Sequence, residues 1–435
     1  MFNYYLQLGL RSLKRNPILT ALMVLGIALG IGASMTTLTV FHLMSSDPIP
    51  WKSDKLHVVQ MDNWGPDEPA NDNGDPPDQV TYRDAVALMA AGKADKQVAM
   101  FKIALPVQPS NPEVKPFREL GRASYADFFS MFEPPFKYGQ AWSKVEDNEH
   151  ARVIVLNKET NDKLFGGENS VGKSVRLDGN DYKVVGVLDR WPLRFTYYDL
   201  TIGPFRDMEA WWIPFTTAVD LKQRASGNNS CWKSPRGDGW DAYLESECVW
   251  IQFWVQLDSP SRLAEYHSFL DAYVNEQKKL GRFARPVDNR LLNVNEWMVN
   301  QKVVSDDVKV QVGLAFAFLI VCLVNTVGLL LAKFTRKSGE VGLRRALGAS
   351  RNDVFRQFLI ESGVVGATGG LIGLLLTWLG LIGVRVLYPN LKSVATLDWS
   401  MIGMTVILSI AAALLAGLYP TWRACRVQPA AQLKI

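Results

Sequence analysis

Four long stretches of the chain carry no charged side chain and are rich in apolar residues. They are Ile18–Phe41, Val310–Ala332, Ser362–Val384 and Trp399–Trp422. A helix needs about 20 apolar residues to cross the hydrocarbon core of a bilayer, and each stretch is long enough to do so. The pattern therefore predicts four transmembrane helices, one before and three after a long polar segment.

The first stretch shares one feature with secretory signal peptides, because the basic residues Arg11, Lys14 and Arg15 precede it. A cleaved signal and an uncleaved anchor are both open readings. The apolar run is longer than the roughly 7–15 residues of a signal peptide's apolar region, and no clear A-x-A cleavage site closes it. We therefore expect an uncleaved anchor.

The polar segment between the first and second spans mixes strand-like and helix-like periods. Helices are expected at Tyr82–Ala91 and Pro260–Leu280, the second with an apolar stripe at helical spacing. Strands are expected at Leu56–Met61, Val98–Val107, Arg152–Leu156, Ser174–Leu177, Tyr182–Leu188, Val249–Leu257 and Arg290–Val294. The outer runs suggest two β-α-β halves packed as one membrane-proximal lobe. The stretch between them, about residues 110–246, predicts an inserted, mainly β subdomain.

The predicted fold class is a membrane α-helical protein with four transmembrane helices and a large extracytoplasmic α+β domain. That domain combines the membrane-proximal β-α-β lobe with the inserted β subdomain. The expected boundaries are 1–46 for the N-terminus and first span, 47–309 for the outer domain, 310–334 for the second span, 335–356 for a loop, 357–388 for the third span, 389–398 for a short outer loop, 399–422 for the fourth span and 423–435 for a tail.

Lysine and arginine near the span ends predict the orientation, because cytoplasmic loops are enriched in them. They gather before the first span, between the second and third spans, and after the fourth. Both termini and the middle loop are therefore expected to be cytoplasmic, and residues 47–309 extracytoplasmic. The basic residues concerned are Arg11, Lys14, Arg15, Lys333, Arg336, Lys337, Arg344, Arg345, Arg351, Arg356, Arg423, Arg426 and Lys434.

Composition supports this division. Hydrophobic residues make up 48% of the 435 residues, the formal net charge is +4, and mean hydropathy is near zero. These values exclude a disordered chain, a collagen-like chain and a purely soluble enzyme. The outer segment holds 32 basic and 39 acidic residues, whereas the three cytoplasmic pieces hold 13 basic and 2 acidic residues. This polarised charge gives no support for a nucleic-acid partner.

Two of the four cysteines lie in the outer segment, where disulfides persist. Cys231 and Cys248 flank a loop rich in Gly, Ser and Asn, while Cys322 lies in the second span and Cys425 at the end of the fourth. The outer pair is either bridged or reduced. We expect a Cys231–Cys248 disulfide that closes the loop.

One outer motif matches a nucleotide-binding pattern, because Gly167–Ser174 reads GENSVGKS and fits G-x-x-x-x-G-K-S/T. A true phosphate-binding loop follows a strand and opens a helix. Here a helical run precedes the motif and a strand-like run follows it, so we expect a glycine-rich turn.

Other chemistry-bearing patterns are missing from the sequence. The histidines His42, His57, His150 and His267 have no metal-ligand spacing, and no G-x-S-x-G elbow is present. The acidic loop Asp62–Gln79 does not follow EF-hand spacing. We expect no catalytic site, no metal and a solvated loop.

The segment between the second and third spans, Arg336–Ser362, is basic and helical in propensity. On composition alone, two readings are open. It is either a short amphipathic helix that docks a partner protein, or a topology signal that contacts only membrane lipid headgroups. Its apolar residues are Val341, Leu343, Leu347 and Phe355, and its central charges are Arg344 and Arg345.

Within this segment, GEVGLRRALGASRNDVFRQFLIES resembles the cytoplasmic loop of MacB/FtsX-type ABC transporter permeases. The opening LRSLKRNPILTALMVLGIALGIGA and the ending GLYPTWRACRVQPAAQLK resemble the ends of the same family. In the outer segment, VIVLNKETNDKLFGGENSVGKSVRLDGNDYKVVGVL and WWIPFTTA resemble the MacB-type periplasmic region. The resemblance covers nearly the whole chain, and it explains the glycine-lysine turn as a structural feature.

The resemblance implies a transporter subunit and not an enzyme. In this family a permease dimer binds two cytoplasmic ABC ATPase subunits, whose ATP-driven dimerisation is transmitted through long helices to the external domains. Only fifteen residues precede the charge-free run that begins at Asn16, so we expect the ATPase to be a separate chain. ATP and Mg would be used there, with no cofactor bound by this chain. The second permease is either another copy or a related chain.

By resemblance, Glu340–Ala349 forms the coupling helix that seats on the ATPase. We expect polar contacts from Glu340, Arg344 and Arg345, apolar contacts from Val341 and Leu347, and Gly348 at the helix end.

The resemblance leaves three outputs open in a bacterial inner-membrane setting. The first is efflux of peptides, antibiotics or lipidic compounds with a periplasmic adaptor and an outer-membrane channel. The others are FtsX-like regulation of cell-wall hydrolases and lipoprotein release. The large outer domain favours efflux.

Small residues in two spans have the G-x-x-x-G spacing that lets membrane helices approach closely. We expect those of the third span to pack within the subunit and those of the first to serve the dimer. They are Gly26 and Gly30 in the first span, and Gly366, Gly369, Gly370 and Gly373 in the third. Glu361, at the start of the third span, is an intramembrane acid and therefore either a functional residue or a side chain hydrated at the interface. It is close enough to the cytoplasmic face that we expect interfacial hydration.

Overall fold

The computed structural model describes residues 7, 16–71, 73–109, 114–388, 391–392 and 395–425. The chain divides into two compact units. We call Met1–Ser46 with Val304–Ile435 the helical unit, and Asp47–Val303 the β-rich unit.

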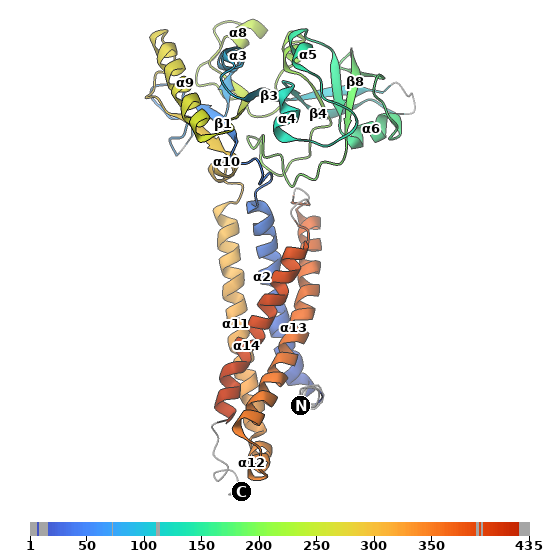
Figure 1. Cartoon of the computed structure of the whole chain (residues 1–435), viewed down its shortest axis with the longest axis vertical. Coiled ribbons are helices and arrows are strands. Elements are labelled where there is room, and N and C mark those ends of the chain that lie inside the picture. Colours follow the sequence, from blue (N-terminus) through green and yellow to red (C-terminus); the bar gives the residue numbers. More distant parts are fainter. Residues whose placement is uncertain are drawn as a thin grey trace. The chain divides into compact units, whose positions relative to one another are not determined.

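The described part of the helical unit has four helices long and apolar enough to cross a membrane (Figure 1). They are α2 (Pro17–Ser45), α11 (Asp306–Arg336), α13 (Arg351–Leu387) and α14 (Trp399–Cys425), and the short helix α12 (Ser338–Ala346) connects α11 to α13. Each contains one of the four predicted spans and extends beyond it by several residues at one or both ends.

Helix α2 has one side in the core of the helical unit and one side outside it. The buried side carries Met23, Ile27, Ile31 and Met35, and the exposed side carries Ile18, Leu22, Leu25 and Leu29. Both sets recur at three- or four-residue intervals, which places each set along one face of a helix. The exposed face is apolar, as expected for a helix that meets lipid.

Glycines on α13 let two neighbouring helices approach on different sides. A Cβ added to Gly366 would lie 2.9 Å from Cα of Ala413 on α14, and one added to Gly370 would lie 2.5 Å from Cβ of Ser409. On another side, a Cβ on Gly373 would lie 2.9 Å from Cγ2 of Ile31 on α2. These residues therefore mediate packing inside the subunit.

The first-span glycines differ from the expectation of a dimer contact. A Cβ on Gly30 would lie 2.8 Å from Cδ1 of Leu319, and one on Gly26 would lie 3.6 Å from Oγ1 of Thr326. Both neighbours belong to α11 of the same chain. The spacing of small residues indicates a close helix contact but carries no information about which helix makes it, and here the partner is internal.

The β-rich unit is built on one mixed sheet, ordered β11-β1-β10-β3-β4-β9-β6-β8-β5, with β2 beside β10 and β7 beside β3 and β8. Most neighbours are antiparallel, while β4–β9 and β6–β8 are parallel. The strands are β1 (Leu56–Met61), β2 (Val80–Thr81), β3 (Lys96–Gln108), β4 (Phe117–Ser124), β5 (Phe136–Gly139), β6 (Val153–Leu156), β7 (Ser174–Leu177), β8 (Asn180–Leu188), β9 (Trp211–Pro214), β10 (Val249–Gln256) and β11 (Asn289–Asn293).

Side chains alternate between two cores, one on each face of the sheet. Trp211 enters the first core and Trp212 the second. Helices α3 (Tyr82–Ala91), α7 (Phe215–Asp220) and α9 (Pro260–Lys279) contribute to the first core, and α4 (Asp127–Phe132) and α10 (Val294–Asn300) to the second. The shorter helices α5 (Lys144–Asn148), α6 (Lys158–Phe165) and α8 (Trp240–Leu244) complete the unit.

The segment expected as an inserted β subdomain extends the same sheet. Strand β3 pairs with β10 over Lys96–Met100 and with β4 over Met100–Val107. Strands β4 to β9 therefore continue from the first lobe through backbone hydrogen bonds. Residues 47–303 accordingly form one compact unit.

Local signals explain where the helices begin and end. The Thr81 hydroxyl accepts a hydrogen bond from the Asp84 amide at the start of α3, and Gly92 ends that helix with φ of 57°. The Ser259 hydroxyl caps α9, with Pro260 at its first position. Such hydroxyl caps, an N-terminal proline and a left-handed glycine are the usual helix boundaries.

Candidate functional site: helix α12 and its ionic contacts

Helix α12 is a short connector with one buried and one exposed side. Val341 is 8% exposed and joins the core of the helical unit. Leu343 is 56% exposed and Leu347 is 80% exposed. Most of the surface of these two apolar side chains is not covered by the described residues, so the outer side of α12 is suited to contact with another surface.

The predicted site residues divide between the two sides. Glu340, Arg344, Leu347 and Gly348 are exposed, and Arg345 is half-buried. Val341 is inward-facing, so it seats α12 on its own bundle and is not an exposed anchor. This differs from its expected role because helical periodicity alone does not tell which apolar side meets the bundle.

The end of α12 is sharply defined. Gly348 has φ of 102°, a left-handed conformation that favours glycine. Its N–H donates to the carbonyl of Arg345 at 3.2 Å, and the Ala349 N–H donates to that of Arg344 at 3.0 Å. Ser350 then caps α13, accepting from the Asp353 amide at 3.2 Å. The connection between the two helices is thus a short, hydrogen-bonded turn.

Arg344 also contacts α13. Its Nη1 donates to Oε1 of Gln357 at 2.7 Å, in an exposed position. This bond orients the guanidinium along the outer side of α12 without burying it, so the charge stays available to an outside partner.

Glu361 is buried, contrary to the expected interfacial hydration. The residue is 1% exposed, and its Oε1 lies 2.7 Å from Nζ of Lys333. Its Oε2 accepts a hydrogen bond from Nζ of Lys337 at 3.0 Å. Side chains shield the carboxylate of Glu361 from water, and the ammonium groups of Lys333 and Lys337 lie beside it.

From the sequence alone, Lys333 and Lys337 are recognisable only as basic residues that indicate orientation. Their spacing of four residues places both on one side of α11. In the sequence, this spacing is the only sign that the two lysines contact the same residue, Glu361. Beside them, the rings of Phe334 and Phe358 stack with centroids 4.2 Å apart. Ionic and aromatic contacts thus join α11 to α13 directly beside α12.

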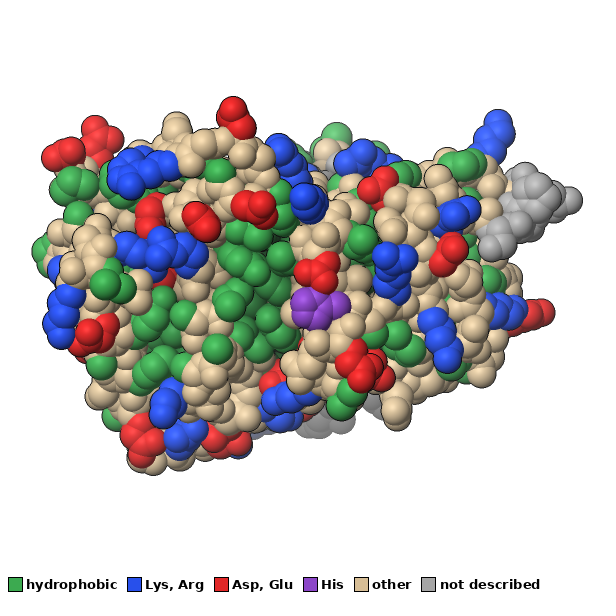
Figure 2. All heavy atoms as spheres, turned by 90° about the horizontal axis from the view of Figure 1, so that it is seen from above, with side chains coloured by type: hydrophobic (Ala, Val, Ile, Leu, Met, Phe, Trp, Pro, Cys, Tyr) green, Lys and Arg blue, Asp and Glu red, His purple; other side chains and the backbone are tan. Residues whose placement is uncertain are grey.

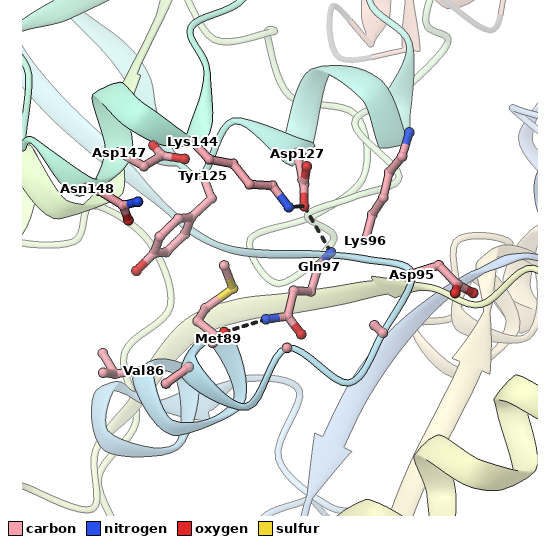
Figure 3. A pocket seen from close by; sticks show the side chains of 13 residues that line it. Val86, Met89, Asp95, Lys96, Gln97, Tyr125, Asp127, Lys144, Asp147 and Asn148 are labelled. Carbon is pink, nitrogen blue, oxygen red and sulfur yellow. Dashed lines mark hydrogen bonds and ion pairs between the residues drawn. The ribbon is translucent and has the colours of Figure 1, made fainter.

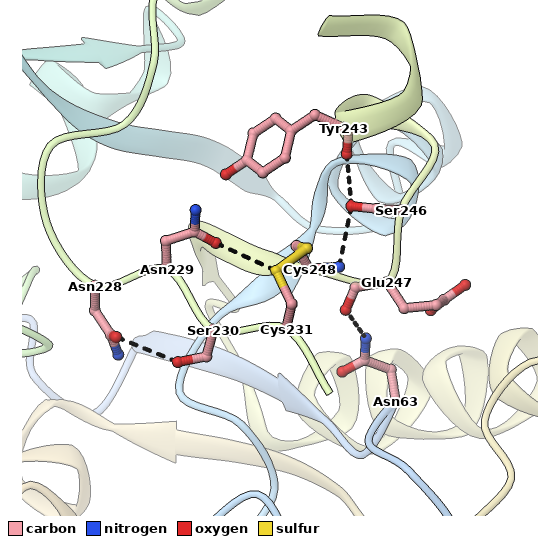
Figure 4. Close-up of a disulfide and its surroundings, with 9 residues drawn as sticks. All are labelled: Asn63, Asn228, Asn229, Ser230, Cys231, Tyr243, Ser246, Glu247 and Cys248. Carbon is pink, nitrogen blue, oxygen red and sulfur yellow. Dashed lines mark hydrogen bonds between the residues drawn. A yellow bond between two sulfur atoms is a disulfide. The ribbon is translucent and has the colours of Figure 1, made fainter. Parts of the chain in front are cut away.

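In the β-rich unit, Cys231 and Cys248 are joined by a disulfide, with their Cα atoms 4.2 Å apart (Figure 4). The adjacent residue Ser230 forms a two-way backbone bridge with Val249 at the start of β10. The Ser246 hydroxyl accepts from the Cys248 amide at 3.2 Å and donates to the Tyr243 carbonyl at 2.6 Å. The bridge therefore fastens an exposed loop to a buried strand.

The glycine-lysine motif is a turn between α6 and β7. Gly167 and Gly172 have φ of 82° and 88°. The Gly172 amide donates to the Val184 carbonyl at 2.8 Å, and Lys173 Nζ lies 3.4 Å from Glu168. The helix precedes the motif and the strand follows it, so this is not the strand-then-helix geometry that holds phosphate.

The acidic loop after β1 is tied to other parts of the β-rich unit. Asp62 accepts from Nε of Arg285 at 2.7 Å, and Asp75 accepts from Nη1 of Arg290 at 2.6 Å. Within the described residues, no group of three or more His, Cys, Asp or Glu side chains is arranged to hold a metal ion.

A cavity of about 380 Å³ lies between α3, Tyr125 and the start of α5 (Figure 3). Met89 and Tyr125 contribute apolar surface, and the ion pair of Lys144 with Asp127, at 3.0 Å, lies on its wall. Figure 2 shows apolar side chains gathered near the centre of one face of the β-rich unit, with charged side chains around them.

A buried ionic network that the sequence does not reveal crosses the middle of the sheet. Arg122 of β4 is completely buried and donates to Glu209 and Asp199, the latter at 2.8 Å. Lys102 of β3 lies 3.7 Å from Asp199 and 3.8 Å from Glu209. These charges lie far apart along the chain, so no local motif marks them.

Comparison with known families accounts for both units. The MacB-like periplasmic core domain matches residues 20–271, and the FtsX-like permease C-terminal domain matches residues 312–429. The first match alone spans more than half of the chain, so the chain belongs to the MacB-like and FtsX-like permeases of the ABC transporter family. It is a multi-pass membrane permease with a MacB-like periplasmic domain.

Individual relatives support the same assignment. The macrolide export ATP-binding/permease protein MacB of Rhodopirellula baltica is 24% identical over 434 residues, which cover 96% of this chain and 60% of the relative. The protein of the same name from Pasteurella multocida is 23% identical, with coverages of 95% and 56%. The chain thus spans about three fifths of the length of the curated relatives it matches.

Two solved structures are similar at low identity. The periplasmic region of MacB from Actinobacillus actinomycetemcomitans is 14% identical with a TM-score of 0.37, covering 60% of this chain and 97% of that one. The extracellular domain of the noncanonic ABC-type transporter YknZ from Gram-positive bacteria is 12% identical with a TM-score of 0.34, covering 55% and 100%.

Proposed function

We propose that this chain is the transmembrane subunit of a MacB-type ABC transporter and that α12 is the surface on which a separate cytoplasmic ABC ATPase acts. The exposed side of α12 carries the proposal. Leu347 is 80% exposed and Leu343 is 56% exposed, while Val341 of the same helix is buried in the bundle. An exposed apolar surface beside Arg344 and Arg345, on a helix whose opposite side is packed against the bundle, is typical of a protein interaction site.

In this proposal both chain termini and α12 lie in the cytoplasm. Two ATPase subunits act on a pair of permeases, and ATP and Mg are used by the ATPase alone. Nucleotide-driven movement of α12 passes through the long helices to the β-rich unit. The output is efflux of peptides, antibiotics or lipidic compounds, with a periplasmic adaptor and an outer-membrane channel as further partners.

The described spans support a mechanical output over a hydrophilic channel. Apart from the charges toward the helix ends, α2, α11, α13 and α14 carry no charged side chain, and their central turns are mainly apolar or small residues. A polar substrate path through the bilayer would need charged or polar side chains along it. Movement of a substrate by the β-rich unit outside the bilayer does not need such a path.

Co-purification tests the docking surface. The full chain is expressed with a candidate ABC ATPase from the same genome, extracted in mild detergent and recovered through a tag in the presence of a non-hydrolysable ATP analogue. We expect the ATPase to be recovered with the wild-type chain and lost from the Arg344→Glu/Arg345→Glu variant. Lys233→Glu/Arg236→Glu is the matched control, because both residues are exposed basic side chains of the β-rich unit.

The outcomes separate two parts of the proposal. Recovery of the wild-type chain without an ATPase would overturn the transporter assignment. Equal recovery with the Arg344/Arg345 variant would leave that assignment and reject α12 as the docking surface.

Transport is tested in cells that express the chain, its ATPase and any adaptor encoded with them. Erythromycin is the first probe, because the relatives named above are macrolide exporters. Lower erythromycin accumulation that depends on the Arg344/Arg345 pair would support efflux. Unchanged accumulation of erythromycin and of a panel of antimicrobial peptides would reject efflux as the output.

A further inference from the structure

The junction of α11 and α12 depends on a single residue. Lys337 is both the residue that ends α11 and the residue that precedes α12, with φ of −92° and ψ of 5°. The direction of α12 relative to α11 is therefore set by one backbone position. A force on α12 would turn it about Lys337 unless something else held that residue.

The side chain of Lys337 supplies such a restraint. Its ammonium lies 3.1 Å from Oε1 and 3.0 Å from Oε2 of Glu361, and Glu361 belongs to α13. Lys337, the residue between α11 and α12, is thus held by an ionic contact to α13, the helix that follows α12 in the chain. This contact restrains a turn of α12 relative to α13, in addition to the hydrogen bond from Arg344 to Gln357.

The two lysines that share Glu361 differ in their access to water. The side chains of Lys333 and Glu361 are 0% and 2% exposed, whereas that of Lys337 is 14% exposed. Separating Lys333 from Glu361 would leave the Lys333 ammonium buried away from its counter-ion, which is strongly unfavourable. Lys337 can instead extend its flexible stem to water, and Glu361 keeps Lys333 as its counter-ion.

We infer that Lys337 and Glu361 form a latch between α12 and α13, and that Lys333 is a positioning residue that holds Glu361 in place whether the latch is open or closed. The closed latch makes α12 and α13 move together, and the open latch lets α12 turn about Lys337. Its role in transport rests on the proposed function of α12; its existence does not.

Other contacts keep α12 seated when the latch opens. Val341 is buried in the core of the helical unit, and the stacked pair of Phe334 and Phe358 joins α11 to α13 independently of the charges. Loss of the Lys337 ammonium should therefore loosen α12 without unfolding the bundle, whereas loss of the Lys333 ammonium should weaken the bundle itself.

Hydrogen exchange on the full chain in lipid nanodiscs tests the latch without any ATPase. In Lys337→Met, we expect amides of residues 338–349 to exchange about tenfold faster or more, as in a local opening. Lys337→Arg should retain the wild-type rates. Lys309→Met is the control, because it removes an exposed lysine at the other end of α11 whose partner is Asp306. Lys333→Met should raise exchange in α11 and α13 as well.

Two results would overturn the latch: exchange at residues 338–349 in Lys337→Met that equals the wild type, or the same broad increase in Lys337→Met and Lys333→Met. The second would show that both lysines have one structural role.

A second measurement connects the latch to transport. With the ATPase bound, we expect Lys337→Met to retain ATPase recovery but to lose most of the dependence of ATP hydrolysis on the permease, and Lys337→Arg to restore it. Full stimulation in Lys337→Met would reject the latch as a coupling element. Failure of the wild-type chain to bind the ATPase would instead reject the proposed function, and the exchange experiment would still decide whether the latch exists.

Discussion

Arg122 and Glu209 form a charged pair in the interior of the β-rich unit, where neither side chain is exposed. Nε of Arg122 donates to Oε1 of Glu209 at 2.9 Å. Burial alone would raise the pKa of Glu209, but the positive charges of Arg122 and Lys102 outweigh it and hold that pKa below its usual value. The same balance lowers the pKa of Asp199. Both carboxylates are therefore charged at neutral pH, and their stability contribution is lost in acid as they are protonated.

Arg122→Met is expected to destabilise the β-rich unit by about 3–5 kcal/mol, because it leaves two buried carboxylates with Lys102 alone. Denaturant unfolding of the full chain, followed by tryptophan fluorescence, measures the change. Arg176→Met is the matched control, since Arg176 is 54% exposed and its partner Asp181 is 64% exposed. A midpoint in Arg122→Met as high as that of the control would contradict this account.

The carboxylate of Asp147 should make the free energy of unfolding depend on pH in the opposite direction. It is 2% exposed, and burial raises its pKa to about 6 despite hydrogen bonds from the Ala126 amide and the Trp142 indole. Because the folded pKa exceeds the unfolded one, the contribution of protonated Asp147 is present below about pH 4 and is lost as the pH rises to 6.

The Asp147→Asn variant isolates this effect. The difference in unfolding free energy between variant and wild type should shift by up to about 3 kcal/mol in favour of the variant between pH 4 and pH 6. Unfolding curves at several pH values measure it. A difference that does not change with pH would show that Asp147 ionises normally in the folded chain, whatever the constant cost of the substitution.

The Cys231–Cys248 disulfide should make the stability of the β-rich unit depend on the redox conditions. Cys231 and Cys248 are 17 residues apart, and closing a loop of this length stabilises a protein by about 3 kcal/mol. The Cys231→Ser/Cys248→Ser variant should lose about that amount. Reducing agent should lower the wild-type chain to the level of the variant and leave the variant unchanged. An equal response of both chains to reducing agent would mean that the loop pair is not bridged.

The helices and strands of this fold can be predicted from the sequence wherever a local pattern determines them. The helix expected at Tyr82–Ala91 is α3, because Thr81 and Gly92 mark its ends and apolar residues recur at helical spacing. Uncharged stretches likewise locate the long helices. The order of the strands in the sheet cannot be predicted in this way. Strand β4 pairs in parallel with β9, which follows it by almost ninety residues, and no local sequence pattern indicates that pairing.

The same limit applies to the candidate site. Position along the third span suggests hydration of Glu361, because a carboxylate near a span end can reach the interface. Its actual environment comes from Lys333 and Lys337 on another helix. Helical periodicity of α12 indicates an amphipathic helix, yet only the packed bundle shows that Val341 faces inward and Leu347 outward.

Gly366 should be intolerant of even one added methyl group. A Cβ there would collide with Ala413, whose Cα would lie only 2.9 Å away. Gly366→Ala is therefore expected to separate α13 from α14 and to lower the temperature at which the detergent-solubilised chain aggregates. Gly363→Ala, on the same helix with open space at its Cβ, should leave that temperature unchanged or slightly higher. Equal behaviour of the two variants would refute the close contact.

Strand β3 also determines how stiff the β-rich unit is. Its first half bonds to β10 on one edge and its second half bonds to β4 on the other, so a bend between the two lobes would have to break the central strand. The unit should consequently move as one rigid body, which is what the proposed mechanical function requires. Any swing relative to the membrane helices would then be concentrated at Ser46–Asp47 and Val303–Val304, where the chain passes from one unit to the other.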